Sequence, residues 1–232
     1  MRAADLPDVK ALQLFCSMSD EHFEQMLQAA YLQNFPAQVE LIREGEPADF
    51  LYIVVEGCVE LYARANGREN TMGMVKPVGT FILAAVLKDA VYLMSARTAQ
   101  RSRLLMVPSA DIRRAFELDE GFARAIVVEL ASCYRTVVKE QKNLKLRTAV
   151  ERLANRLLQY SGEQGERDEL VLPHDKRTLA SLLGMTPENL SRAFNTLRPY
   201  GVEVDGANIR LTDRKSLEVL AKPNRLIDDW RT

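Results

Sequence analysis

Hydrophobic and polar positions follow three successive patterns along the chain, and the first two predict short helices and then many strands. Residues 7–31 read as short helices, one of which Ser19 or Asp20 can cap. From about 38 to 107 the chain reads as short strands rich in Val, Ile, Leu and Tyr. Turn residues at EGEPAD and RANGRE separate these strands, and the Asn-Gly pair in the second predicts a tight hairpin. Many short strands separated by such turn residues predict a barrel or roll.

The third pattern is a long helix that begins at Ser109 and runs to Arg147 without proline, with Gly121 as its only glycine. Apolar residues recur along it in the 4-3 steps of a coiled-coil seam, with a polar exception at Glu140. Such a stripe can also pack on its own domain, but a helix this long beyond a compact roll favours dimerisation. The predicted dimerisation residues are Ile126, Leu130, Cys133, Val137 and Leu144.

After about residue 148 the helical pattern continues through AVERLANRLLQY, a polar loop SGEQGERDE follows, and LVLP reads as a short strand. The order of elements predicts an α+β fold in three parts: a β-roll over 1–118, a dimerisation helix over 119–147, and a DNA-binding domain over 148–232.

The C-terminal part contains the signals of two helices joined by a short turn. Asp175 can cap the first helix, and Gly184 can end it because glycine accepts the left-handed backbone of a helix stop. Thr186 can cap the second helix, and Pro187 suits its first position because its missing N–H is not needed there. This arrangement predicts a helix-turn-helix whose second helix enters the major groove of DNA.

The second helix carries four polar residues on one face: Glu188, Ser191, Arg192 and Asn195 lie at i, i+3, i+4 and i+7. The guanidinium of Arg192 matches guanine O6 and N7, Glu188 can accept from cytosine N4, and Ser191 can contact a base or a phosphate. The alternative is a solvated face with an internal Glu188–Arg192 ion pair.

The context favours DNA. VEVDGANIRL alternates around Asp205-Gly206, which predicts the hairpin of a winged helix. Residues 175–215 contain seven Lys or Arg against five Asp or Glu, a net charge of +2. Phosphate contacts position a protein on DNA without specifying sequence. The remaining candidate DNA-binding residues are Lys176, Arg177, Thr186, Arg198 and Arg210.

Composition limits the other function classes. The chain has 232 residues, 31 Lys+Arg and 32 Asp+Glu, a balance that neither favours nor excludes nucleic acid. Its longest apolar runs are far shorter than the roughly 18 to 20 residues that span a bilayer, and MRAADLPDVK lacks the apolar core of a signal peptide, so we expect a cytoplasmic protein with no membrane partner. Three scattered cysteines and two histidines form no metal cluster, nucleophile–base pair or phosphate loop, which argues against an enzyme. A ligand-binding or protein-interaction module without DNA remains the rival class.

The order of roll, long helix and winged helix-turn-helix resembles the CRP/FNR superfamily over about residues 10–221. The glycines of its roll match Gly45 and Gly57 in REGEPADFLYIVVEGCVELY, and its recognition helix matches TPENLSRAF. The E-x-x-S-R pattern of Glu188, Ser191 and Arg192 is similar to the FNR branch. The resemblance implies a two-fold symmetric homodimer on a TTGAT and ATCAA palindrome, acting as an activator with RNA polymerase as a partner.

The resemblance also implies which effectors do not fit. The cyclic-nucleotide pocket of the family uses Gly-Glu for the ribose and Arg-Ser for the phosphate. This chain has Ala84 or an apolar neighbour where the Glu is expected, and Ala90-Val91 where Arg-Ser is expected. Arg97 is the one substitute nearby, but it matches a strand position of the family. The iron–sulfur branch needs a cysteine cluster near the N-terminus, where only Cys16 stands. Cyclic AMP and an iron–sulfur cluster are therefore not expected.

GTFILAAVLKDAVYLMSARTA is more similar to the nitric-oxide-responsive Dnr and NnrR branch, which has an apolar sensor pocket and has been linked to haem. Haem is therefore the cofactor that this likeness implies, without an assignable ligand. The alternative is that the apolar run simply forms the core of the roll. The candidate effector-pocket residues are Phe81, Ile82, Leu83, Val86, Leu87, Tyr92, Met94 and Arg97.

Overall fold

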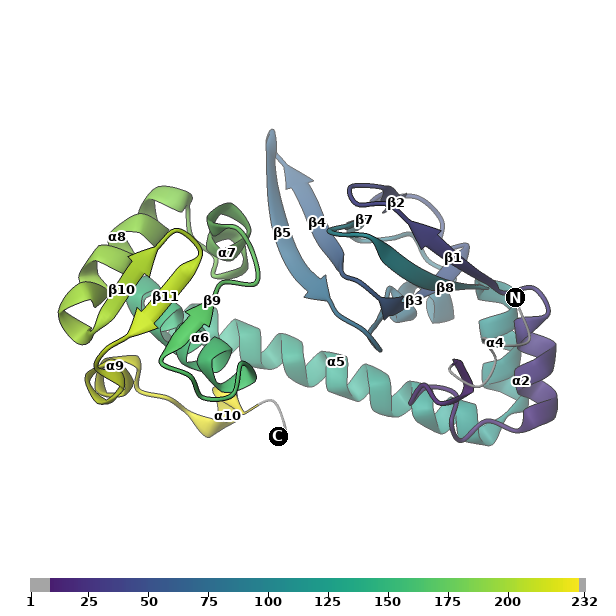
Figure 1. Cartoon of the computed structure of the whole chain (residues 1–232). Coiled ribbons are helices and arrows are strands. Elements are labelled where there is room, and N and C mark those ends of the chain that lie inside the picture. The colour runs from purple at the N-terminus through teal and green to yellow at the C-terminus, as the bar shows by residue number, and fades with distance from the viewer. Residues whose placement is uncertain (1–8, 230–232) are drawn as a thin grey trace. The chain divides into compact units, whose positions relative to one another are not determined.

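In the computed structural model, which describes residues 9–229, the strand-rich region folds into two antiparallel sheets (Figure 1). Their strands are contributed from distant parts of the sequence. The first sheet has the order β1 (Tyr31–Phe35), β8 (Ser102–Pro108), β3 (Phe50–Glu56) and β6 (Thr80–Phe81); the second has the order β2 (Glu40–Ile42), β7 (Ser95–Thr98), β4 (Val59–Ala65) and β5 (Arg68–Val75). The predicted β-roll is confirmed.

The predicted Asn-Gly turn and the connection at Gly57 both form where glycine allows the backbone conformation. The Asn-Gly pair joins β4 to β5, with Asn66 at φ 52° and Gly67 at φ 73°, and Ala65 pairs directly with Arg68. Gly57 separates β3 from β4 at φ 92°, and a Cβ added there would lie 2.5 Å from the carbonyl oxygen of Arg101. Only glycine therefore allows this close approach of the two chain segments.

The apolar run FILAAVL does not continue as a strand. After β6, Ile82 adopts a left-handed backbone with φ 67°, and the short helix α3 (Leu83–Lys88) begins. The short helix expected near the start of the chain is α2 (Asp20–Leu27), and the Ser19 side chain accepts a hydrogen bond from the His22 amide at its N-terminus. Capping by Ser19 is confirmed.

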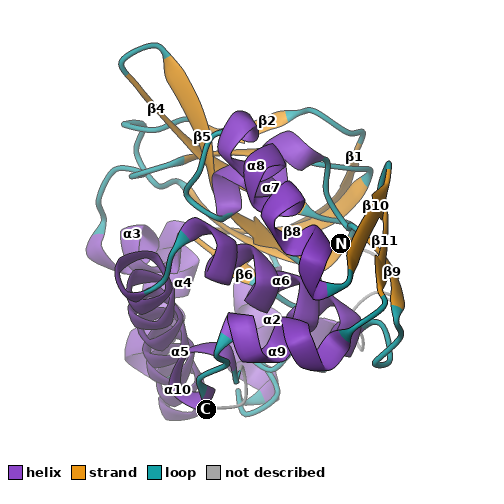
Figure 2. Ribbon diagram, turned by 90° about the vertical axis from the view of Figure 1, so that its left-hand side faces the viewer, coloured by secondary structure: helices purple, strands orange, loops and turns teal. Residues whose placement is uncertain are grey.

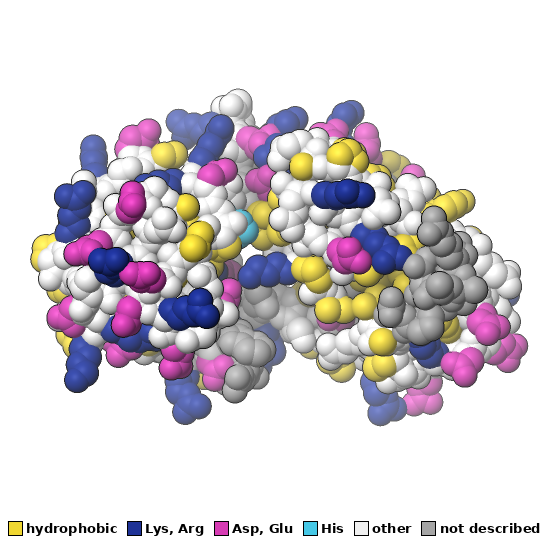
Figure 3. All heavy atoms as spheres, in the orientation of Figure 1, with side chains coloured by type: hydrophobic (Ala, Val, Ile, Leu, Met, Phe, Trp, Pro, Cys, Tyr) yellow, Lys and Arg dark blue, Asp and Glu magenta, His cyan; other side chains and the backbone are white. Residues whose placement is uncertain are grey.

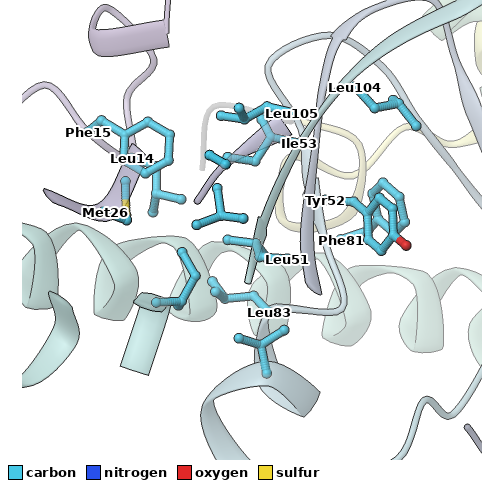
Figure 4. Close-up of a cluster of buried hydrophobic side chains, with 14 of the residues drawn as sticks. Leu14, Phe15, Met26, Leu51, Tyr52, Ile53, Phe81, Leu83, Leu104 and Leu105 are labelled. Carbon is cyan, nitrogen blue, oxygen red and sulfur yellow. The ribbon is translucent and has the colours of Figure 1, made fainter. Parts of the chain in front are cut away.

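The core of the roll lies between its two sheets and the helices beside them. Figure 4 shows Leu51 and Ile53 from β3 beside Leu105 from β8. The rings of Tyr52 and Phe81 stack with centroids 5.3 Å apart. Phe15 stacks on Phe122 at 5.9 Å, so the N-terminal segment and the long helix join the same core.

The long helical stretch is two helices, which corrects the expectation of a single helix from Ser109. Helix α4 (Ser109–Leu118) ends before Asp119, whose backbone is extended, and α5 (Glu120–Leu146) begins after it. The Asp119 carboxylate accepts from the Phe122 amide at 2.8 Å and thereby caps the new helix. A capping side chain at this position makes two separate helices more favourable than one continuous helix.

The second part of the chain builds its own core around α6 (Ala149–Glu163). Figure 2 shows three strands side by side and, around α6, the helices of this unit. The strands are β9 (Glu169–Val171), β11 (Asn208–Leu211) and β10 (Val202–Asp205); the other elements are α7 (Lys176–Leu182), α8 (Pro187–Leu197), the 3-10 turn η2 (Arg198–Tyr200), α9 (Arg214–Ala221) and α10 (Arg225–Asp228). The predicted winged helix-turn-helix is confirmed. Helices α9 and α10 were not predicted.

The chain divides into two compact units, Met1–Cys133 and Tyr134–Thr232, so the boundary falls inside α5. The predicted division into a roll over 1–118, a dimerisation helix over 119–147 and a domain over 148–232 concerns roles rather than packing, and it stays a prediction.

Candidate nucleic-acid interface and sensor region

The two helices of the predicted motif begin and end at the predicted residues. The Asp175 side chain accepts from the Thr178 amide at 2.7 Å at the start of α7, and Gly184 has φ 61° in the turn after it. The Thr186 side chain accepts from the Asn189 amide at 3.3 Å, and Pro187 is the first residue of α8. These caps fix where the recognition helix starts, because each satisfies an amide that has no partner within its own helix.

Helix α8 has one buried and one exposed face. Its Leu190, Phe194 and Leu197 side chains are buried in the core of this unit. The opposite face brings the predicted base-contacting residues together in solvent: Glu188, Ser191, Arg192 and Asn195 are all exposed. The packing of the apolar face therefore determines which polar side chains are presented outward.

The groups around the Glu188 carboxyl at the start of α8 favour its ionised form. The pKa of Glu188 is lowered by a hydrogen bond from its own backbone amide, by the Thr186 hydroxyl and by the charge of Arg192. The carboxylate is therefore ionised at neutral pH, as an acceptor for a base amino group must be. The Ser191 hydroxyl donates to the Pro187 carbonyl at 3.0 Å within the helix, which leaves its oxygen lone pairs as acceptors.

The candidate phosphate contacts divide into two groups. Lys176, Arg177 and Arg198 are exposed, and the Lys176 ammonium lies 5.9 Å from the centre of the Phe194 ring. Arg210 lies on β11 and already pairs with Glu169 at 2.8 Å, so part of its charge is neutralised within the sheet. Figure 3 shows Lys and Arg side chains along the α8 side of this unit, interspersed with Asp and Glu.

The wing differs from the prediction by one residue. Asp205 pairs with Asn208 across the hairpin, so the two turn residues are Gly206 and Ala207 rather than Asp205 and Gly206. Gly206 has φ 61°, a conformation that glycine adopts without strain. The strand predicted at LVLP is β9, which pairs with β11 and extends the wing to three strands.

Arg152 was not among the sequence-based candidates, although it contacts the turn of the motif. Its Nε donates to the Leu183 carbonyl at 2.8 Å and its Nη1 to the Arg147 carbonyl at 2.8 Å. The only sequence signal is an arginine at a position in α6 that faces the domain rather than solvent, and the sequence gives no partner for it.

The predicted effector residues are largely part of the core of the roll. Phe81, Leu83, Val86 and Tyr92 are buried among the core residues. Ile82, Leu87 and Met94 are partly buried. This burial supports the interpretation of the apolar run as core, and the assignment of these residues to an effector pocket stays a prediction.

Arg97 lies in a network of charged side chains on β7, β4 and β5. Its guanidinium contacts Glu60 at 2.8 Å and Glu69 at 2.9 Å, and it lies 4.4 Å from the centre of the Tyr62 ring. Burial disfavours its charge, but the hydrogen bonds that Arg97 donates to Glu60 and Glu69 outweigh that effect, and the pKa of Arg97 is raised.

A cyclic nucleotide does not fit this arrangement. A phosphate bound to Arg97 would lie close to the carboxylates of Glu60 and Glu69, and negative charges repel each other strongly where solvent screening is weak. Ala84, at the position expected to bind ribose, and Ala90 offer no charged or hydrogen-bonding side chain.

The predicted dimerisation stripe of α5 is only partly exposed. Ile126 is fully buried in the core of the roll and packs on its own domain, so it is not available to a partner in this structure. Leu130 packs partly against the same core. Cys133 and Val137 are exposed, and Leu144 is exposed but lies beside Gly184 in the turn before α8.

Two protein-family models match the chain. The model described as a cyclic nucleotide-binding domain matches residues 32–119, and the model described as a Crp-like helix-turn-helix domain matches residues 151–220. A CRP-like cAMP-activated global transcriptional regulator of Mycobacterium tuberculosis is 25% identical over 190 residues, which cover 79% of this chain and 85% of that protein.

Solved structures have the same fold. FixK2 from Bradyrhizobium japonicum is 25% identical, with a TM-score of 0.70 over 84% of this chain and 98% of that one. DNR from Pseudomonas aeruginosa is 24% identical, with a TM-score of 0.51 over 95% of this chain and 99% of that one, which is a likeness of fold. DNR is one of several structural neighbours, and the comparisons do not resolve a branch.

Across residues 9–229, no helix combines the length and the apolar character needed to cross a membrane. Over the same residues, no group of three or more His, Cys, Asp or Glu side chains is placed to hold a metal ion.

Proposed function

Because the chain belongs to the CRP/FNR family of DNA-binding transcription regulators, we propose that it reads a TTGAT-type palindrome as a homodimer. The family is not enzymatic, and its members are typically dimers with an effector-binding domain of the cyclic-nucleotide-binding type. The observation that carries the proposal is the exposed stripe of Glu188, Ser191 and Arg192 on α8, opposite a buried apolar face.

Each residue of the stripe has a chemical role in the proposed complex. Arg192 donates two hydrogen bonds to the guanine of the TTGAT half-site, and Glu188 accepts from a cytosine amino group. Ser191 and Asn195 complete the contacts on the same face. Lys176, Arg177 and Arg198 bind phosphates and hold α8 in the groove.

The test is a comparison of two arginine-to-alanine variants. Arg192→Ala removes a base contact, so we expect it to abolish the preference for the TTGAT palindrome over a duplex with guanine replaced by adenine, a loss of about 1–3 kcal/mol of discrimination. Arg198→Ala removes a phosphate contact, so we expect weaker binding to both duplexes with the same ratio between their affinities. The slope of the logarithm of affinity against the logarithm of salt concentration should fall by about one. Fluorescence anisotropy over a range of salt concentrations measures both quantities.

Two outcomes contradict the proposal. If Arg192→Ala still discriminates between the duplexes, Arg192 does not read guanine. If the unmodified protein binds neither duplex even at low salt, the helix pair serves as a docking surface for another molecule.

The signal that controls DNA binding is a second part of the proposal. We infer that the protein is an activator that contacts RNA polymerase, and that its effector acts on the roll through the segment that contains α3. The likeness of that segment to the Dnr and NnrR branch supports nitric oxide and haem over cyclic AMP. In this mechanism the effector changes packing in the roll, and α5 passes the change to the DNA-binding domains of the dimer.

A further inference from the structure

The side chain of Arg152 joins backbone carbonyls from two places that are far apart in sequence. Its Nε donates to Leu183 at 2.8 Å, and its Nη2 lies 3.4 Å from the carbonyl of Gly184. Its Nη1 donates to the Arg147 carbonyl at 2.8 Å, in the link between α5 and α6. One guanidinium therefore connects the end of the long helix to the turn that precedes the recognition helix.

The chemistry of this contact requires arginine. Within the described residues no carboxylate forms an ion pair with Arg152, and partial burial lowers its pKa, so the backbone carbonyls compensate for the partly buried charge. A planar guanidinium presents donors in several fixed directions, whereas a lysine ammonium places all of its donors on one atom. Lysine can keep the charge but cannot reach both the link and the turn together.

A second contact joins the same two places. A Cβ added to Gly184 would lie only 2.7 Å from the Leu144 side chain, so the last turns of α5 pack closely against the turn. The amides of Leu183, Gly184 and Met185 donate to carbonyls within α7, which makes the turn a single hydrogen-bonded unit. Leu144 and Arg152 therefore hold this unit from two sides.

We propose that Arg152 is a positioning residue for DNA recognition, which fixes the turn, and with it the start of α8, to the end of α5. This proposal rests on the proposed DNA-binding function. It adds that the Arg152 contacts pass the orientation of the end of α5 to the recognition helix. Arg152 does not contact DNA in this account. It acts by restricting the directions in which α8 can point.

The test uses Arg152→Met and Arg152→Lys in the full chain. We expect both to lower the affinity for the TTGAT palindrome by about tenfold or more, since hydrogen bonds to a charged group are lost. We expect the affinity for an unrelated duplex and the salt dependence to stay as in the unmodified protein, because the phosphate contacts remain. Hydrogen exchange followed by mass spectrometry should be faster over Leu183–Met185 than in the unmodified protein.

The matched control is Arg156→Met. Arg156 lies one turn further along α6 and pairs with Glu140 at 3.4 Å, without contacting the turn. We expect this variant to keep both the palindrome preference and the slow exchange of the turn. Arg152→Lys covers the case in which Arg152→Met does not fold, since it retains the buried charge and the aliphatic part of the side chain.

Each outcome decides the proposal. Equal losses of affinity for the palindrome and for unrelated DNA would overturn it, because a residue that only stabilises the fold affects all binding in proportion to the folded fraction. Unchanged hydrogen exchange at the turn in both Arg152 variants would overturn it as well. If the unmodified protein shows no palindrome preference, the proposed function fails. The exchange measurement then still decides whether Arg152 holds the turn.

Discussion

Asp119 shows how one side chain can organise the junction of three segments. Its carboxylate accepts from the Phe122 amide at 2.8 Å, from the Ser19 amide at 3.0 Å and from the His22 ring Nδ1 at 2.9 Å. It therefore caps α5 and ties the start of α2 to the same point. Next to it, a Cβ at Gly121 would collide with the Ser17 carbonyl, so the chain approaches closely here.

The ionisation of Asp119 is linked to stability. Burial opposes its charge, but the hydrogen bonds from His22, Phe122 and Ser19 outweigh that effect and hold the pKa of Asp119 well below its usual range. A carboxyl group whose pKa is lower in the folded state stabilises the fold fully above its unfolded pKa of about 3.9. That contribution is lost as the pH falls below this value towards the folded pKa.

We predict that Asp119→Asn lowers the free energy of unfolding by about 1–3 kcal/mol at pH 7, because the buried amide of Phe122 and the partly buried amide of Ser19 lose a charged acceptor. The difference from the unmodified protein should stay constant between pH 7 and 5 and begin to shrink below about pH 4. Denaturant unfolding at each pH measures it. A difference that grows on acidification would contradict the assigned role.

At the scale of the element, α5 has two different halves. Its first turns contribute Phe122 and Ile126 to the core of the roll, where both are fully buried. Beyond them it exposes Val127, Tyr134 and Val137, with exposed fractions of 58%, 71% and 59%. Apolar side chains gathered this way on one helix indicate a surface that another chain covers. We therefore place the dimer contact on the exposed stripe and not on Ile126.

We predict that Val137→Asp converts the protein from a dimer to a monomer, because a charge at the centre of an apolar helix contact is costly to bury. The dimer dissociation constant should rise by about a hundredfold or more, equivalent to ~3 kcal/mol. Analytical ultracentrifugation over a range of concentrations measures the change. Val219→Asp on α9 is the control, since Val219 is 78% exposed and lies outside the stripe. A dimer that persists unchanged in Val137→Asp would place the interface elsewhere.

At the scale of the whole molecule, the proposed function requires that a signal in the roll alters DNA binding by the C-terminal unit. The roll keeps the fold of a cyclic nucleotide-binding domain over residues 32–119. Its arginine on β7, Arg97, is nevertheless held by Glu60 and Glu69, and Ala84 and Ala90 carry no charged or hydrogen-bonding side chain. The fold has thus been retained while the side chains that would bind a charged nucleotide have not.

We predict that cyclic AMP, up to millimolar concentration, changes neither the affinity for the TTGAT palindrome nor the thermal stability, because Arg97 is already paired with Glu60 and Glu69 and a phosphate there would face both carboxylates. A saturable rise in either quantity would contradict this. Titration with haem under anaerobic conditions, followed by nitric oxide, is the parallel measurement. A stoichiometric Soret shift that changes again with nitric oxide is expected for the proposed gas-sensing branch, and an absence of saturable binding would remove haem.

Much of the fold and of the DNA-binding site was predictable, because local chemistry determined it. The Asn-Gly hairpin, the caps at Asp175 and Thr186 and the stop at Gly184 all depend on residues within a few positions of one another. The break before α5 was not predicted, because the carboxylate that caps the helix accepts two of its three hydrogen bonds from Ser19 and His22, about a hundred residues earlier.

The sequence by itself determined the kind and order of the elements and the polar stripe of α8, since periodicity and capping act between near neighbours. Only the tertiary structure decided which apolar residues are core and which remain exposed, so that Ile126 is buried while Val137 is not. It also decided that Arg97 is neutralised by Glu60 and Glu69 and that Arg152 reaches the carbonyl of Leu183. These contacts join residues distant in sequence, and their distances depend on how the whole domain packs.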